Sequence, residues 1–130
     1  MGLTRRGYAF RIAFTMPYLN IQTNITVTAE RREIVLKRSS ALVSEVLGKP
    51  EKYVMVALKD EVPMLFGGSS DPVAFLELKS IGLSGGSTRE YAREFCKFIT
   101  ETLDIPGERV YVKFNDAQRS MWGWNGDTFD

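Results

Sequence analysis

The chain has 130 residues, of which 44% are hydrophobic and 25% are charged, and this size and composition are typical of one globular domain. Its 17 basic and 16 acidic side chains nearly cancel, so it lacks the positive excess typical of proteins that bind nucleic acids or anionic membranes. No apolar run approaches the roughly 20 residues that span a bilayer. Histidine is absent and Cys96 is the one cysteine, which excludes Ser-His and Cys-His nucleophiles, an internal disulfide and the usual zinc sites.

Residues 1–16 precede the first regular pattern and contain three arginines but no acidic residue. Three origins are open for them: an upstream start site or residues added by cloning, a short organelle-targeting segment, or an ordered arm. We therefore treat residues 1–16 as an N-terminal extension and residues 17–130 as the domain.

The first half of the domain predicts a strand, a helix and a second strand. Apolar and polar residues alternate over 18–25, which is typical of a strand with one buried face. A helix-spaced apolar pattern follows between a capping threonine, Thr28, and a terminating glycine, Gly48. The run Tyr53–Leu58 is apolar and rich in β-forming residues, and it predicts an interior strand.

The second half repeats this order. A loop over 67–72 is followed by a predicted strand over 73–81. A second helix opens at Gly85 and is ended by Pro106-Gly107, and the segment 110–114 predicts the next strand.

Sliding the sequence against itself by 56 residues aligns the two helix-to-strand corners. The identical pairs are Leu47 with Leu103, Pro50 with Pro106, Val54 with Val110, Val56 with Val112, and Asp60 with Asp116. About one identity is expected by chance over this stretch. The sequence therefore predicts an α+β fold made of a duplicated β-α-β unit, with a right-handed crossover in each unit and a four-stranded mixed sheet.

Two helices on one face of this sheet would leave the other face uncovered. The segments 53–58 and 74–78 are apolar on both sides, so the open face would expose on the order of several hundred Å² of apolar surface. We therefore expect an oligomer in which sheets pack against one another.

Several short segments have both a functional and a structural interpretation. Removal of Met16 would leave Pro17 with a free secondary amine, although proline is also common at strand starts because it cannot donate to the ladder. Lys49 follows a helix C-terminus, where the helix dipole alone favours a cation. The aromatic residues near the C-terminus, Trp122, Trp124 and Phe129, could attach the chain to a neighbouring subunit or form a wall for an aromatic ligand.

Together these segments resemble the macrophage migration inhibitory factor family of the tautomerase superfamily, from residue 16 to residue 129. The motifs that carry the resemblance are Met16-Pro17, Gly48-Lys49-Pro50 followed by Tyr53, Phe66-Gly67-Gly68-Ser69-Ser70, Ser80-Ile81-Gly82, Arg109-Val110-Tyr111, Trp124-Asn125-Gly126 and Thr128-Phe129. The resemblance implies a homotrimer with its active sites at the subunit interfaces.

The resemblance also implies the role of individual residues. Pro17 matches the catalytic base, Lys49 the lysine that holds a substrate carboxylate, and Ile81 a backbone N–H donor. Tyr111 matches a tyrosine supplied by the neighbouring chain. The remaining residues near the pocket are Lys113, Trp122, Trp124 and Phe129, and two of them, Lys113 and Trp122, replace smaller or uncharged residues and make the site more cationic and narrower.

The implied function is a keto-enol tautomerase of the phenylpyruvate or dopachrome type, acting on phenylpyruvate-like α-keto acids if the chain is processed to Pro17. The alternative is a cytokine-like protein that binds a cell-surface receptor, with residual or no tautomerase activity. We expect no metal or organic cofactor, no nucleic acid and no membrane partner. A cytoplasmic location is expected, while secretion without a signal peptide and organelle targeting by residues 1–16 stay open.

Overall fold

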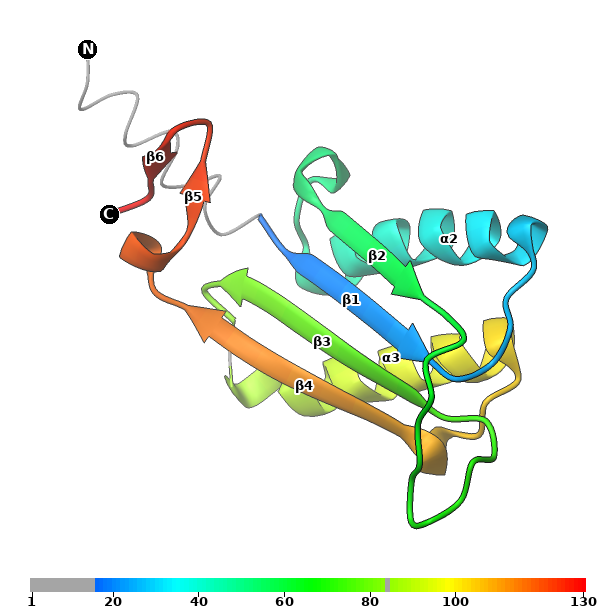
Figure 1. Ribbon diagram of the computed structural model, residues 1–130. Coiled ribbons are helices and arrows are strands. Elements are labelled where there is room, and N and C mark those ends of the chain that lie inside the picture. Colours follow the sequence, from blue (N-terminus) through cyan, green and yellow to red (C-terminus); the bar gives the residue numbers. More distant parts are fainter. Residues whose placement is uncertain (1–15, 84) are drawn as a thin grey trace.

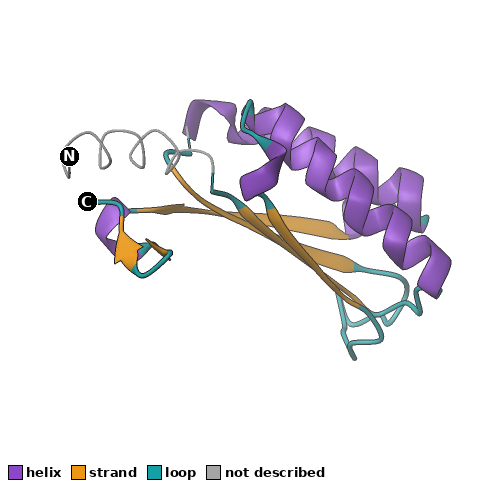
Figure 2. Cartoon of the chain, turned by 90° about the horizontal axis from the view of Figure 1, so that it is seen from above, coloured by secondary structure: helices purple, strands orange, loops and turns teal. Residues whose placement is uncertain are grey.

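The computed structural model describes residues 16–83 and 85–130, so the expected N-terminal extension lies outside the described residues except for Met16. Two helices pack on one face of a four-stranded sheet, and a small hairpin lies beyond the end of the last long strand (Figure 1, Figure 2). The elements are β1 (Tyr18–Thr23), α2 (Ala29–Leu47), η1 (Glu51–Tyr53), β2 (Met55–Lys59), β3 (Ala74–Ile81), η2 (Gly85–Ser87), α3 (Thr88–Leu103), η3 (Gly107–Arg109), β4 (Val110–Ala117), η4 (Arg119–Met121), β5 (Gly123–Trp124) and β6 (Asp127–Thr128).

The sheet has the order β2-β1-β3-β4. β1 pairs with β2 in parallel, β3 pairs with β4 in parallel, and β1 and β3 join the two halves in antiparallel register. The duplicated β-α-β unit and the mixed sheet are thereby confirmed. The expectation that Tyr53–Leu58 forms an interior strand is wrong, because the two units join through their first strands and β2 is therefore left at an edge of the sheet.

The helix boundaries are set by residues close to them in the sequence. The hydroxyl of Thr28 accepts a hydrogen bond from the Arg31 N–H at 3.2 Å, which caps α2, and Gly48 ends it with a φ of 65°. α3 ends at Leu103, and the next residue, Asp104, adopts a φ of 58°. Within the described parts of the chain, neither helix is long and apolar enough to cross a membrane.

The core lies between the helices and the sheet. Alternate residues of β1 and β3 face the helices, and the largest buried side chains in this layer are Leu19, Ile21, Leu76, Leu78, Val35, Val43, Phe95 and Ile99. Cys96 packs against this core, and its partial burial raises the pKa of the thiol. The alternation over 18–25 predicted a strand with one buried face, and β1 has this pattern.

The open face of the sheet is more polar than expected. Asn20 of β1 pairs with Glu77 of β3, which in turn pairs with Lys113 of β4, and all three lie on the side away from the helices. The expectation that 74–78 is apolar on both sides holds for Phe75 but not for Glu77, which takes the other outward position of this segment. Met55 and Tyr111 remain 65% and 63% exposed on this face. Association with further copies stays a prediction.

Candidate functional site

A second, smaller cluster of buried side chains lies apart from the main core. Met16, Ile81 and Phe129 form it, and Tyr53, Ala117 and Trp122 pack against it. The strand register explains this convergence: Tyr18 pairs with Lys79, so the residues just before β1 lie beside the end of β3, and Ile81 pairs with Ala117 at the end of β4. Segments far apart in the sequence thus meet at one end of the sheet.

Aromatic rings line this end. Trp124 lies nearly parallel to Phe129, with ring centroids 6.3 Å apart, and it meets Tyr53 edge-on at 6.0 Å. The hairpin of β5 and β6 presents Trp124, and its turn uses Asn125 and Gly126 with φ of 52° and 81°. The sequence placed Tyr53 in a predicted strand and in a family motif but not in the site, and the hairpin was not predicted, although Asn-Gly is its usual signal.

Pro17 is buried immediately before β1. Its carbonyl accepts a hydrogen bond from the Met55 N–H at 3.0 Å, which fixes the strand start against β2. In the chain with Met16 attached, the proline nitrogen belongs to a tertiary amide and has no basic lone pair. The position is therefore suited to a base only when Pro17 is the first residue.

Lys49 is held at the end of α2. Its N–H donates to the Ser44 carbonyl at 2.9 Å, and the Ser44 hydroxyl donates to the Lys49 carbonyl. The side chain is half-buried, and desolvation lowers the pKa of Lys49 from its ordinary value. Tyr53, whose ring meets Trp124, follows Lys49 by four residues, and η1 connects the two.

Tyr111 and Lys113 do not join this cluster within one chain. Tyr111 pairs with Phe75, six positions before the pair of Ile81 with Ala117, and six strand residues span about 20 Å. The Tyr111 ring instead contacts Phe66, with centroids 4.9 Å apart. A site that contains both Tyr111 and Pro17 therefore requires a second copy of the chain.

The turn after β3 is held by a carboxylate that sequence reasoning did not assign to the site. Asp116 Oδ1 accepts hydrogen bonds from the Gly82 N–H at 2.9 Å and from the Leu83 N–H at 3.1 Å. A cavity of about 540 Å³ lies at this turn, and its lining residues are Ile81, Gly82, Asp116, Ala117, Gln118, Arg119, Ser120 and Asp130. The only earlier signal for Asp116 was its match to Asp60 in the internal repeat.

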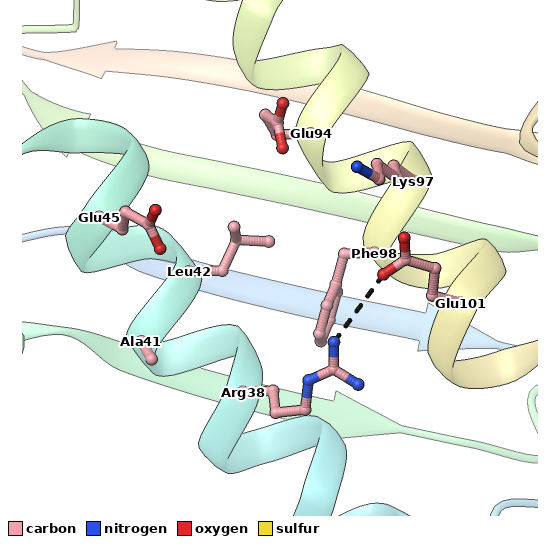
Figure 3. Close-up of a pocket in the computed structure, with 8 residues that line it drawn as sticks. All are labelled: Arg38, Ala41, Leu42, Glu45, Glu94, Lys97, Phe98 and Glu101. Atoms are coloured by element: carbon pink, nitrogen blue, oxygen red, sulfur yellow. Dashed lines mark ion pairs between the residues drawn. The ribbon is translucent and has the colours of Figure 1, made fainter.

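Another cavity, of about 290 Å³, lies between the two helices (Figure 3). Arg38 of α2 approaches Glu101 of α3 at 3.8 Å and lies over the Phe98 ring at 5.7 Å. Leu42 and Phe98 form its apolar part, while charged side chains surround it. It contains none of the site residues expected from the sequence, so the end of the sheet near Pro17 is the better candidate.

Comparison with known proteins agrees with this geometry. The family model described as macrophage migration inhibitory factor matches residues 16–130. The chain is 40% identical over 115 residues to a macrophage migration inhibitory factor homolog of Brugia malayi and 34% identical over 115 residues to the factor of Xenopus tropicalis, in each case over 88% of this chain and 99% of the relative.

Solved structures agree as well. The macrophage migration inhibitory factor homologue from Prochlorococcus marinus superposes with a TM-score of 0.82 at 42% identity, over 87% of this chain and 99% of that chain. The factor from Trichinella spiralis gives a TM-score of 0.80 at 34% identity, over 86% and 99%. The chain belongs to the macrophage migration inhibitory factor family.

Proposed function

We propose that the chain, when its first residue is Pro17, is a keto-enol tautomerase that acts on phenylpyruvate-like α-keto acids. The observation that carries the proposal is the convergence of Met16, which directly precedes the buried Pro17, with Ile81 and Phe129, beside the aromatic wall of Trp124 and Phe129. Membership of a family that includes tautomerases supports it. The wall suits an aromatic substituent, and the buried strand start suits an uncharged amine.

The reaction requires one proton to move between carbon and oxygen. The Pro17 amine takes a proton from the carbon beside the carbonyl, a carbon–carbon double bond forms, and the carbonyl oxygen becomes an enol on protonation. The amine acts only when unprotonated, and an ordinary α-amino group has a pKa of about 7.7–8.0. Apolar surroundings and the Lys49 charge both disfavour the protonated amine and lower this pKa.

The other site residues bind and orient the substrate. Lys49 pairs with the carboxylate, and the Ile81 N–H polarises the oxygen on which charge develops. In a homotrimer a neighbouring copy adds the Tyr111 hydroxyl and the Lys113 ammonium, which one chain holds too far away. Trp122 narrows the pocket beside Phe129.

The proposal treats residues 1–16 as an extension of a domain that covers 17–130. The experiment compares a chain that begins at Met1 with one that begins at Pro17, using the ultraviolet absorbance of the phenylpyruvate enol. A positioned general base contributes about 10²–10⁴ in rate, so the trimmed chain should be faster by about this factor. Equal kcat/KM for the two chains would contradict Pro17 as the base.

A receptor-binding role has no observation of its own among the described residues.

A further inference from the structure

We propose that Asp116 is a positioning residue that aims the Ile81 backbone N–H at the substrate oxygen. The inference rests on the proposed tautomerase function and adds a part that neither the sequence motifs nor the comparisons assign. It starts from one carboxylate oxygen, Asp116 Oδ1, that accepts two successive backbone N–H groups, those of Gly82 and Leu83, at 2.9 and 3.1 Å.

These bonds fix the peptide group that follows Ile81. The Gly82 nitrogen is bonded to the Ile81 carbonyl carbon, so holding the Gly82 N–H sets the orientation of that peptide plane and the ψ angle of Ile81. The Ile81 N–H belongs to the preceding peptide, between Ser80 and Ile81, so Asp116 acts on this donor through the backbone of Ile81. Gly82 has a φ of 78°, a conformation that is readily available to glycine and rare for other residues. The turn therefore depends on Gly82 for its shape and on Asp116 for its anchor.

Ile81 itself is fixed from the other side. Its side chain is 3% exposed in the cluster with Met16 and Phe129, and its backbone pairs with Ala117 of β4. β3 also extends two residues past Lys79, the partner of the first residue of β1. The Ile81 backbone thus lies at the end of the sheet, beside Met16 and Pro17, and a change in the turn reaches the Ile81 N–H through the backbone of Ile81.

The position of Asp116 favours a role in the site beyond holding a turn. Asp116, Ile81 and Gly82 line the same cavity of about 540 Å³, and this cavity meets the cluster of Met16, Ile81 and Phe129 through Ile81 and Ala117. A donor that stabilises a developing oxyanion is effective only when it is oriented before the reaction, because reorientation would cost part of the stabilisation.

The internal repeat supplies a matched control. Asp60 is equivalent to Asp116, and its Oδ2 accepts the Val27 N–H at 2.8 Å in the turn after β1. β1 and β3 are antiparallel, so this turn lies at the opposite end of the sheet, about 20 Å from Pro17. Replacing Asp60 removes the same kind of bond, together with an ion pair to Arg32 at 3.1 Å, without touching the proposed site.

The experiment uses the chain that begins at Pro17 and compares Asp116→Ala, Asp116→Asn and Asp60→Ala. Asp116→Ala should lower kcat for phenylpyruvate by about 10- to 100-fold, with a smaller change in KM, because a misplaced donor affects the transition state most. Asp116→Asn keeps an oxygen acceptor and should restore most of kcat. Asp60→Ala should keep the parental kcat even where its thermal midpoint falls.

A second readout does not depend on activity. The Ile81 amide resonance, observed by ¹H–¹⁵N NMR, should move in Asp116→Ala and stay in place in Asp60→Ala. If the parent chain has no tautomerase activity, the proposed function fails and this comparison alone decides whether Asp116 orients Ile81. Should Asp116→Ala not fold, Asp116→Glu moves the acceptor by one methylene and should lower kcat. Unchanged kcat in the folded variant, or an unchanged Ile81 amide, overturns the inference.

Discussion

Asp60 and Asp116 occupy equivalent places in the two halves of the chain. Each carboxylate accepts a hydrogen bond from a backbone N–H in the turn that follows the first strand of its own unit. Asp60 binds the Val27 N–H at 2.8 Å, and Asp116 binds the Gly82 N–H at 2.9 Å. The two carboxylates therefore anchor opposite ends of the sheet. Asp116 lies at the proposed site, whereas Asp60 lies at the other end and contributes to stability alone.

Stability should fall in acid as Asp60 is protonated. The Val27 N–H and the Arg32 guanidinium lower the pKa of Asp60, so its folded pKa is below its unfolded value of about 3.9. Such a group contributes stability above the unfolded pKa, and the contribution is lost as pH falls through the folded pKa. Urea midpoints measured from pH 6 down to pH 3 should decrease, and Asp60→Asn should reduce that decrease. Glu108→Gln, which removes an exposed carboxylate, is the control, and an equal effect from it would contradict the assignment.

The main features of the fold could be predicted because they are encoded locally. Thr28 and Gly48 bound α2 through capping and a left-handed turn, and both effects depend on residues close in sequence. The edge position of β2 could not be predicted in this way. An apolar segment shows that its side chains avoid water, but it does not specify which strand lies beside it.

Residues of the proposed site could be predicted only where they belong to a sequence motif of the family. Pro17, Ile81 and Phe129 were expected together, and the structure brings their segments to one end of the sheet. Tyr53 and Asp116 were not assigned, because their roles depend on contacts with Trp124 and with the Gly82 turn, both distant in sequence. No local pattern contains that information.

We predict that the chain is a trimer in solution. Tyr111 lies about 20 Å along β4 from the end that contacts Ile81, so the proposed site is incomplete in one copy. Light scattering should give about 44 kDa, three times the chain mass of 14.7 kDa. A stable monomer at micromolar concentration would contradict both the trimer and the interface site.

Lys49→Ala should raise KM for α-keto acids more than for their methyl esters, because only the acid pairs with the ammonium group. Burial lowers the pKa of Lys49, so KM for the acid should also begin to rise with pH below the ordinary lysine value of about 10.4. Lys37→Ala removes an exposed lysine of α2, the helix that precedes Lys49, and should leave both constants unchanged. Equal losses on acid and ester would leave Lys49 with a helix-terminal role only.

The last prediction concerns Met16, whose side chain fills part of the proposed pocket while the Met16–Pro17 bond is intact. Met16 is 5% exposed and packs with Ile81 and Phe129, so it competes with an aromatic ligand for the same apolar surface. In the uncleaved chain, Met16→Ala should open this space and tighten phenylpyruvate binding by about tenfold, equivalent to about 1.4 kcal/mol, as measured by tryptophan fluorescence. Turnover should stay at the low level of the parent uncleaved chain, because the Pro17 nitrogen is still an amide. Met121→Ala, which truncates a methionine that is 77% exposed, should leave the Kd at the parental value. If Met16→Ala binds no tighter than Met121→Ala, the pocket does not extend to the position of Met16, and loss of the amine alone accounts for any inactivity of the uncleaved chain.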